Sequence, residues 1–252
     1  MYKFSIITVV YNAKEVLEKT VQSIQYQTYK DFEHIIVDGG STDGTLEYIQ
    51  SLSIDNLKYV SEMDNGIYDA MNKGIGLSNG EYLLFLNAGD NFYSENILEK
   101  IVDEINELDS KPKIIYGGAN VYSEDGKFIT TLNPLKFNKK NLNRYATRTV
   151  CHQSIFIRHD CIKMYSDKYR LKGELNWYYE LIENIEDEYI YKSNIVICDY
   201  YLGGTGDKNF KENYFERISV TKQHNSLFAF ISLMPFFLIP LVFRLKRVIF
   251  GK

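Results

Sequence analysis

Strand-like and helix-like segments alternate through the first hundred residues, and this alternation constrains the fold more than any other feature. Short apolar runs rich in β-branched residues are typical of buried strands, and they occupy residues 3–10, 32–37, 57–60 and 82–86. Segments with apolar residues at helical spacing follow each of them, at 13–27, 43–52, 68–77 and 97–108. The alternation predicts right-handed βαβ units and a parallel sheet covered by helices on both faces.

The pattern changes after about residue 110. Residues 113–122 and 127–132 flank Glu124-Asp125-Gly126 and predict a hairpin. Residues 152–157 and 189–201 predict further strands, and residues 178–185 predict a helix. We therefore divide the chain into residues 1–110, residues 111–226 and a distinct tail, residues 227–252.

The tail begins with seventeen uncharged residues, 227–243, and four basic residues follow before the chain ends. A helix that spans a membrane needs about 20 apolar residues, and Pro235 and Pro240 would interrupt one here. We expect the tail to associate with a membrane surface, with its basic rim on anionic headgroups. The alternative is a C-terminal helix packed on the domain.

Charge and cysteine content exclude several classes of protein. The net charge of −4 argues against nucleic-acid binding. Three cysteines are too few for a disulfide framework, and their odd number favours a reducing compartment. The N-terminus leads directly into a strand pattern without a signal-peptide layout, so we expect a cytoplasmic protein.

Polar residues stand where the predicted strands end. Tyr11 follows the first strand and Asp38 follows the second, so a parallel sheet would make them neighbours. A tyrosine ring can stack on a flat base, and a carboxylate can accept from a base N–H or a ribose hydroxyl. Asp90 lies just past the apolar run 82–86, where a carboxylate can hold a divalent cation beside a phosphate.

Two common nucleotide-binding motifs are missing from this pattern. A dinucleotide fingerprint requires glycines directly after the first strand, but residues 11–14 are Tyr-Asn-Ala-Lys. A phosphate-binding loop of the G-x-x-x-x-G-K-[ST] type is also absent from the sequence. Dehydrogenase and P-loop interpretations are therefore disfavoured.

Four motifs, T-V-V-Y-N, V-D-G-G-S-T-D-G-T, S-E-M-D-N-G-I-Y-D-A-M-N-K-G-I and L-N-A-G-D, occur in this order. Together they resemble the family 2 glycosyltransferases over about residues 3–204, most closely the small bacterial enzymes that build cell-surface polysaccharides. The resemblance implies an inverting enzyme of the GT-A fold that acts on nucleotide sugars. The predicted fold class is α/β, with a Rossmann-like, mostly parallel sheet flanked by helices, an acceptor-side subregion and an apolar C-terminal helical tail.

The resemblance also implies which residues bind the donor. Thr8, Tyr11 and Asp38 would hold the nucleoside, usually uridine, while residues of the third helical segment and its flanks would line the cleft beside the base, ribose or diphosphate. The full predicted donor set is Thr8, Tyr11, Asp38, Asp64, Asn72, Lys73, Asn87 and His152. For Asn72 an internal hydrogen-bonding role stays open, and for His152 the predicted contact is the donor phosphate or the metal.

Asp90 matches the last acid of the family's metal motif, which implies Mg²⁺ or Mn²⁺ as cofactor. Asn87 and Gly89 stand where many relatives carry a carboxylate, so the cation would be held largely by the diphosphate. Glu174 is the candidate base for the acceptor hydroxyl, with a surface acid at a helix start as the alternative. The loop 203–209 resembles one that closes over the donor.

These observations lead to a functional hypothesis. The chain would be an inverting glycosyltransferase that moves a sugar from a nucleotide sugar, UDP-linked, to a lipid-linked or surface-polysaccharide saccharide. Residues 1–110 would bind the donor, residues 111–226 the acceptor and residues 227–252 the inner face of the cell membrane. The alternatives are a non-catalytic nucleotide- or saccharide-binding module and, less favoured, a sugar nucleotidyltransferase, which would need a glycine-rich basic loop after the first strand.

Overall fold

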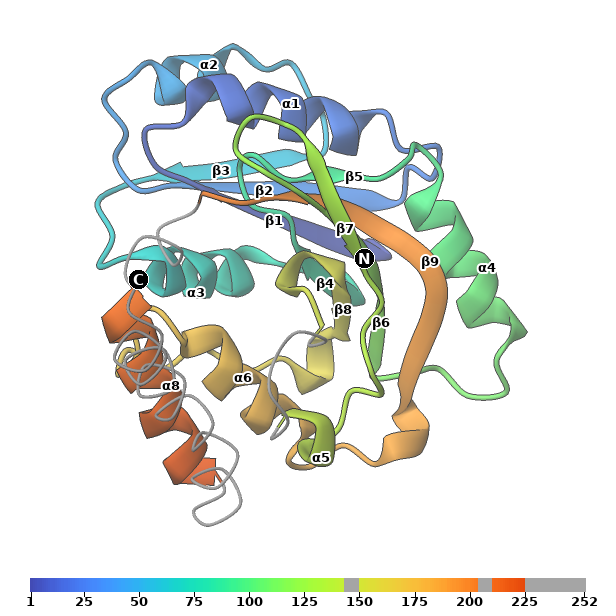
Figure 1. Cartoon of the computed structure of the whole chain (residues 1–252). Coiled ribbons are helices and arrows are strands. Elements are labelled where there is room, and N and C mark those ends of the chain that lie inside the picture. Colours follow the sequence, from blue (N-terminus) through green and yellow to red (C-terminus); the bar gives the residue numbers. More distant parts are fainter. Residues whose placement is uncertain (143–149, 204–209, 225–252) are drawn as a thin grey trace.

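The computed structural model describes residues 1–142, 150–203 and 210–224. Its nine strands form one sheet in the order β3-β2-β1-β4-β8-β6-β9-β5, and β7 pairs with β6 (Figure 1). The strands are β1 (Phe4–Val10), β2 (Phe32–Asp38), β3 (Leu57–Ser61), β4 (Tyr82–Phe85), β5 (Asn91–Phe92), β6 (Ile114–Tyr122), β7 (Phe128–Leu132), β8 (Ile155–Arg158) and β9 (Ile190–Tyr201).

Helices cover this sheet from both sides. The α-helices are α1 (Lys14–Gln25), α2 (Thr45–Ser51), α3 (Ile67–Leu77), α4 (Ile97–Glu107), α5 (Lys139–Leu142), α6 (Gly173–Ile182) and α8 (Phe210–His224). Three short 3₁₀ helices are η1 (His152–Ser154), η2 (His159–Cys161) and η3 (Asp187–Tyr189). Figure 1 shows α1 and α2 on one side of the first strands, with α3 and α6 on the other.

The first four strands confirm the βαβ alternation. β1 pairs in parallel with β2 and β4, and β2 pairs in parallel with β3. Because β1 lies between β2 and β4, the sheet grows first in one direction and then in the other. Such a reversal opens a crevice at the carboxyl ends of the strands, where ligands bind in open α/β sheets.

The second half of the chain continues the same sheet with mixed pairing. β8 runs antiparallel to β4 and β6, whereas β6 and β9 pair in parallel. β5, directly after Asp90, pairs antiparallel with β9. The end of β9 is therefore drawn beside the turn that follows β4.

Alternating residues of the strands point to opposite faces of the sheet and pack in separate apolar layers. Val10 and Ile36 pack beneath α1 and α2 with Leu17, Val21 and Ile49. The opposite face joins α3 and α6 to the sheet through a cluster that includes Ile7, Val9, Ile35, Val37, Ala70, Met71, Ile75, Leu175 and Trp177. Strand residues that are buried on both faces explain why these runs are continuously apolar.

Three details of the second half differ from the sequence expectations. α6 begins at Gly173, five residues before the predicted start, because most of its side chains are buried and the amphipathic pattern is lost. The predicted strand 152–157 opens as the 3₁₀ turn η1 and becomes β8 only at Ile155. α8 was not predicted at all, since its sequence is largely polar.

Two predictions concern residues for which the structure gives little or nothing. The tail 227–252 and most of the loop 203–209 lie outside the described residues. In the part of the chain that is described, the helices are all too short or too polar to cross a membrane.

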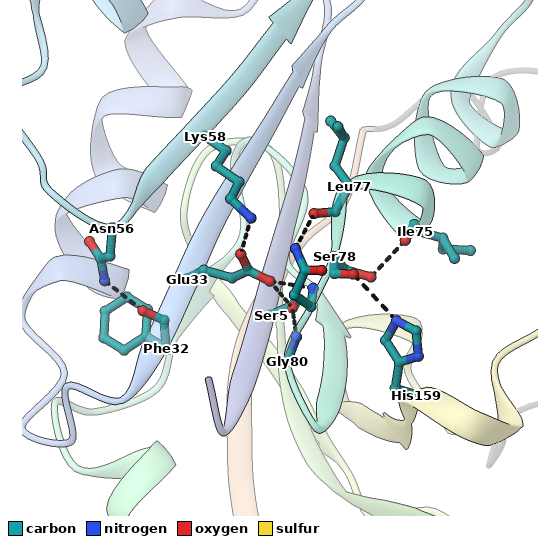
Figure 2. Close-up of polar contacts among 11 residues, drawn as sticks. Ser5, Phe32, Glu33, Asn56, Lys58, Ile75, Leu77, Ser78, Gly80 and His159 are labelled. Carbon is teal, nitrogen blue, oxygen red and sulfur yellow. Dashed lines mark hydrogen bonds and ion pairs between the residues drawn. The ribbon is translucent and has the colours of Figure 1, made fainter. Parts of the chain in front are cut away.

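A buried carboxylate ties the amino ends of the strands together (Figure 2). Glu33 is fully buried, and it accepts hydrogen bonds from the Ser5 hydroxyl at 2.6 Å and the Asn79 N–H at 2.5 Å. Its other oxygen pairs with Lys58 at 2.7 Å. Burial alone would raise the pKa of Glu33, but these donors outweigh it and hold the pKa below its usual value. The cluster fixes the register of β1, β2 and β3 with the start of β4, at the edge opposite the strand-end residues.

We expect Gly74→Ala to destabilise the protein by about 1–3 kcal/mol, because overpacking forces neighbours apart. A Cβ at Gly74 in α3 would lie 2.4 Å from Ile7 Cγ2 in β1. Gly76, in the same helix, has nothing within 4 Å of its Cβ position. Gly76→Ala is the matched control and should stabilise by about 0.5–1 kcal/mol. Urea unfolding of both variants checks this; equal effects would contradict the close contact.

A second prediction concerns stability in acid. His34 is fully buried, its Nε2 lies 3.0 Å from the Thr8 hydroxyl, and burial lowers its pKa to about 3. Below about pH 6.5 the unfolded chain binds a proton that the folded chain excludes, so stability is full above that pH and falls towards pH 3. Between pH 6.5 and 4.5, wild type should lose about 2.3 kcal/mol more than His34→Gln, with the steepest loss below about pH 5.5.

The measurement is urea unfolding across this pH range, with His159→Gln as the control because His159 is exposed. An unchanged pH slope in His34→Gln would show that His34 takes up its proton in the folded state.

Candidate functional site

Three strand ends meet at Gly39. Tyr11 follows β1 with 65% of its surface exposed, and Asp64 follows β3. A Cβ at Gly39, just after β2, would lie 2.5 Å from Asp64 Oδ2 and 3.4 Å from the Tyr11 ring. The missing side chain therefore lets the Asp64 carboxylate and the Tyr11 ring approach the same backbone. The structure brings these two predicted donor residues together.

Asp38 and Thr8 lie beneath this corner rather than on it. Asp38 is fully buried and accepts hydrogen bonds from the Ser61 hydroxyl at 2.5 Å and the Ser41 N–H at 3.2 Å. It thereby joins the loops that follow β2 and β3. Thr8 is also fully buried, with its hydroxyl beside His34. Their contacts give both residues a structural role, and a nucleoside contact for either one stays a prediction.

Lys73 and Asn72 face different surroundings although they are adjacent on α3. Lys73 pairs with Glu62 at 2.9 Å and Asp69 at 3.6 Å. Burial works against its charge, but the hydrogen bond to Glu62 and the nearby carboxylates raise the pKa of Lys73. Asn72 uses both ends of its amide on the Tyr165 backbone, at 3.0 and 2.7 Å. The internal role that the sequence left open for Asn72 is thus seen in its contacts.

Asp90 is a nearly buried carboxylate beyond β4. Its Oδ2 accepts from the Gln153 side-chain amide at 2.8 Å, and its Oδ1 accepts from the Tyr201 N–H at 3.1 Å. Burial raises the pKa of Asp90 to about 7, although both hydrogen bonds favour the charged form. Two neutral donors do not compensate a buried charge fully, so a cation beside this group would be stabilised.

The turn that carries Asp90 is held by the Thr20 hydroxyl of α1 through two hydrogen bonds. Gly89 has φ of +103°, and its N–H donates to the Thr20 hydroxyl of α1 at 3.0 Å. That hydroxyl donates in turn to the Asp90 carbonyl at 2.8 Å. Asn87 Oδ1 is buried and has no hydrogen-bond partner among the described residues. An unpaired buried acceptor next to Asp90 is free to receive a ligand.

These residues fit a metal that takes most of its ligands from a substrate. Among the described residues, no group of three His, Cys, Asp or Glu side chains is placed to hold a metal ion. A carboxylate offers about four lone-pair sites, and hydrogen bonds occupy two of those on Asp90. Magnesium is commonly bound by one or two carboxylates together with substrate phosphates. Asp90 and Asn87 are the residues that would hold such a cation.

His152 belongs to an aromatic wall, a set of packed rings formed by Phe85, His152, Tyr165 and Trp177. Its ring stacks on Phe85 of β4 at 5.0 Å and hydrogen-bonds the Tyr165 hydroxyl. Burial lowers the pKa of His152 to about 3, so the imidazole is neutral. Trp177 is fully buried and stacks on Tyr165 at 4.7 Å, so it packs within this wall. A contact of His152 with phosphate or metal stays a prediction.

Glu174 stands in the first turn of α6. Its side chain is 41% exposed, and its carboxylate lies 3.5 Å from the Lys172 ammonium. Tyr68 of α3 stacks on Tyr165 at 5.1 Å, and its ring lies close to the backbone of Gly173, just before Glu174. The wall therefore continues from β4 to the start of α6. Glu174 is accessible, as a base for an external hydroxyl must be.

Sequence reasoning missed several residues that complete this site. Gln153 was not among the predicted donor or metal residues, yet its side-chain amide contacts Asp90. The Tyr201 N–H reaches Asp90 only because β9 returns beside the turn. Gly39 was not missed in this way, because the paired glycines after the second predicted strand indicate a close approach of the backbone. Backbone donors such as Tyr201 carry no sequence signal.

Comparison with known proteins identifies the family. Residues 5–170 match Glycosyl transferase family 2. A PGL/p-HBAD biosynthesis glycosyltransferase of Mycobacterium bovis BCG is 30% identical over 230 residues, covering 86% of this chain and 84% of that protein. An uncharacterized glycosyltransferase of Rickettsia conorii is 36% identical over 143 residues, which span 55% of this chain and 24% of that protein.

Solved structures share the fold at low identity. TarS of S. aureus in complex with UDP-GlcNAc has a TM-score of 0.67 at 16% identity, covering 87% of this chain and 65% of that one. A mannosyltransferase of Pyrobaculum calidifontis in complex with GDP-Man and Mn²⁺ has a TM-score of 0.58 at 16% identity, covering 88% and 61%. The chain belongs to glycosyl transferase family 2, an enzyme family, and the predicted GT-A fold is confirmed.

Tyr11→Ala should weaken UDP binding about threefold to tenfold, because stacking on an exposed ring contributes roughly 0.5–1.5 kcal/mol. Tyr26→Ala is the matched control. Tyr26 is 69% exposed, close to the 65% of Tyr11, but it lies at the C-terminal end of α1, whereas Tyr11 precedes the N-terminal end. Isothermal titration with UDP and Mn²⁺ measures both. Equal affinities in the two variants would remove Tyr11 from the nucleoside site.

Proposed function

We propose that this chain transfers one sugar from a UDP-linked donor to a saccharide acceptor, with inversion at the anomeric carbon. The observation that carries the proposal is the gathering of Tyr11, Asp64 and Asp90 beyond the carboxyl ends of β1, β3 and β4 in one sheet. This edge offers an aromatic ring for a base and a carboxylate for a phosphate-bound cation. The likeness to TarS in complex with UDP-GlcNAc supports a UDP-linked donor.

The donor would lie across the reversal of the sheet. Its base would stack on Tyr11 near Asp64, and its diphosphate would extend towards Asp90 and Asn87. A bound Mg²⁺ or Mn²⁺ would supply neutralisation of the charge that grows on the departing diphosphate. Lys73 keeps its charge among carboxylates of the neighbouring loop and can exchange one of them for a phosphate.

Glu174 would act as the general base on the acceptor side. Its carboxylate takes the proton of the acceptor hydroxyl while that oxygen bonds to the anomeric carbon. The bond from this carbon to the diphosphate breaks, and the electron pair leaves with the diphosphate. Attack from the face opposite the leaving group inverts the anomeric configuration.

The acceptor is proposed to be a lipid-linked or surface-polysaccharide saccharide. Two observations support this: the mycobacterial relative is named for PGL/p-HBAD biosynthesis, and residues 227–252 combine an apolar run with basic residues. Such a tail would hold the enzyme on the inner face of the cell membrane, close to its acceptor. Residues 1–110 would then serve the donor and residues 111–226 the acceptor.

A non-catalytic nucleotide-binding module is the second candidate. The observation that favours it is the sparse set of acids: both oxygens of Asp90 already accept hydrogen bonds, and Asn87 and Gly89 stand where many relatives carry a carboxylate. Such a module would bind UDP without releasing it from a sugar nucleotide.

A panel of sugar nucleotides, including UDP-GlcNAc and GDP-Man, tests the proposal through release of UDP or GDP with lipid-linked saccharide acceptors. Asp90→Asn and Glu174→Gln should each lower turnover at least about 100-fold, in line with the usual contribution of a general base or a metal ligand. Asp103→Asn and Glu183→Gln are the controls, because both side chains are exposed and lie outside the site. UDP binding without release from any donor would favour the module, and full activity in either site variant would remove that residue's role.

A further inference from the structure

The backbone at the start of α6 is held by residues from other helices. The N-cap position, Lys172, makes no side-chain cap hydrogen bond. Glu216 of α8 instead binds the N–H groups of Lys172 and of the two residues before it. Its carboxylate accepts from the N–H of Arg170 at 3.0 Å, of Leu171 at 2.7 Å and of Lys172 at 2.8 Å. Three consecutive charge-assisted bonds to one side chain are a strong anchor.

The rest of α8 grips the same segment. Gln223 Oε1 accepts from the Tyr169 hydroxyl at 2.8 Å. His224 Nε2 lies 2.9 Å from Asn176 Oδ1, and its ring stacks on Tyr179 at 4.8 Å. Contacts from α8 therefore reach residues before Glu174, such as Tyr169, and residues after it, such as Asn176. Glu216 is the member of this set whose partners, residues 170–172, directly precede the first turn of α6.

Tyr68 of α3 holds the same turn from the other side. A Cβ at Gly173 would lie 2.6 Å from the Tyr68 ring, so the ring rests on the backbone there. Burial and the Glu174 carboxylate raise the pKa of Tyr68 well above its usual range, while the N–H groups of Glu174 and Gly173 favour the ionised oxygen. With Glu216, the amides of residues 170–174 thus face partners from α3 and α8.

We propose that Glu216 is a positioning residue for Glu174: it fixes the backbone that aims the Glu174 carboxylate at the acceptor hydroxyl. The inference rests on the proposed function of Glu174 as the base. Glu174 follows Lys172 by two residues, and Lys172 both donates its N–H to Glu216 and places its ammonium 3.5 Å from Glu174. Releasing this anchor moves the base, and a displacement of about 1 Å can cost about 100-fold in rate.

Glu216→Gln tests this in a double-mutant cycle with Glu174→Gln. The amide keeps the shape of the side chain but turns an NH₂ group towards backbone N–H donors. We expect Glu216→Gln to lower kcat about tenfold to 100-fold, with the donor KM within about twofold of wild type. In the Glu174→Gln background, the same change should lower kcat less than about twofold, because the group it positions is gone.

Glu212→Gln is the matched control, since Glu212 lies one turn earlier on α8, is exposed and carries the same charge. It should leave kcat unchanged. An equal loss from Glu216→Gln in both backgrounds would overturn the inference, as would full activity of that single variant. Full activity of Glu174→Gln would overturn the base itself, whereas an inactive Glu174→Gln beside an active Glu216→Gln removes only the positioning role.

Amide hydrogen exchange at residues 170–172 keeps the test decisive where Glu216→Gln fails to fold. Glu216→Asp retains the charge but is one methylene shorter, so it cannot reach all three donors. Its exchange at these amides should rise at least about tenfold over Glu212→Gln, because an unpaired amide near the surface opens readily. Unchanged exchange would overturn the proposed anchor.

Discussion

The structure depends on the position of β1 between β2 and β4. α3 must cross the sheet closely to deliver β4 to the free side of β1, and Gly74 permits this because a Cβ there would lie 2.4 Å from Ile7. Once β4 is in place, Tyr11 and Asp90 follow adjacent parallel strands and so belong to one crevice. The shared edge of Tyr11 and Asp90, the turn that bears Asp90 and the return of β9 all follow from this crossing.

Two buried carboxylates, Glu33 and Asp90, differ in how far their surroundings compensate the buried charge. Glu33 is surrounded by a hydroxyl, an amide and the Lys58 ammonium, and its pKa is lowered. Asp90 has only two neutral donors, and its pKa is raised to about 7. A compensated charge holds strands in register, whereas an undercompensated one is stabilised by an added cation. The two carboxylates lie at opposite ends of the parallel strands.

Contacts between distant segments build the part of the fold that carries Glu174. η1 presents Gln153 to Asp90 and His152 to Tyr165, and Tyr165 continues through Tyr68 to the start of α6. α8 closes this arrangement by anchoring the backbone before Glu174. Asp90 and the start of α6 are therefore connected through Gln153, His152, Tyr165 and Tyr68 by packed side chains.

The sequence by itself determined the α/β alternation, the GT-A class and the strand-end positions of Tyr11, Asp38 and Asp90, because periodicity and local motifs encode which residues end buried parallel strands. It also placed Glu174 at a helix start, although that helix begins earlier than predicted because its buried side chains hide the period. Only the tertiary structure decided that Asp38 and Thr8 are covered, that Asn72 bonds the Tyr165 backbone, and that Gln153 and the Tyr201 N–H meet Asp90. The two contacts of Asp90 depend on pairings across 63 residues with Gln153 and 111 residues with Tyr201, and no local pattern records which distant segment will supply a donor.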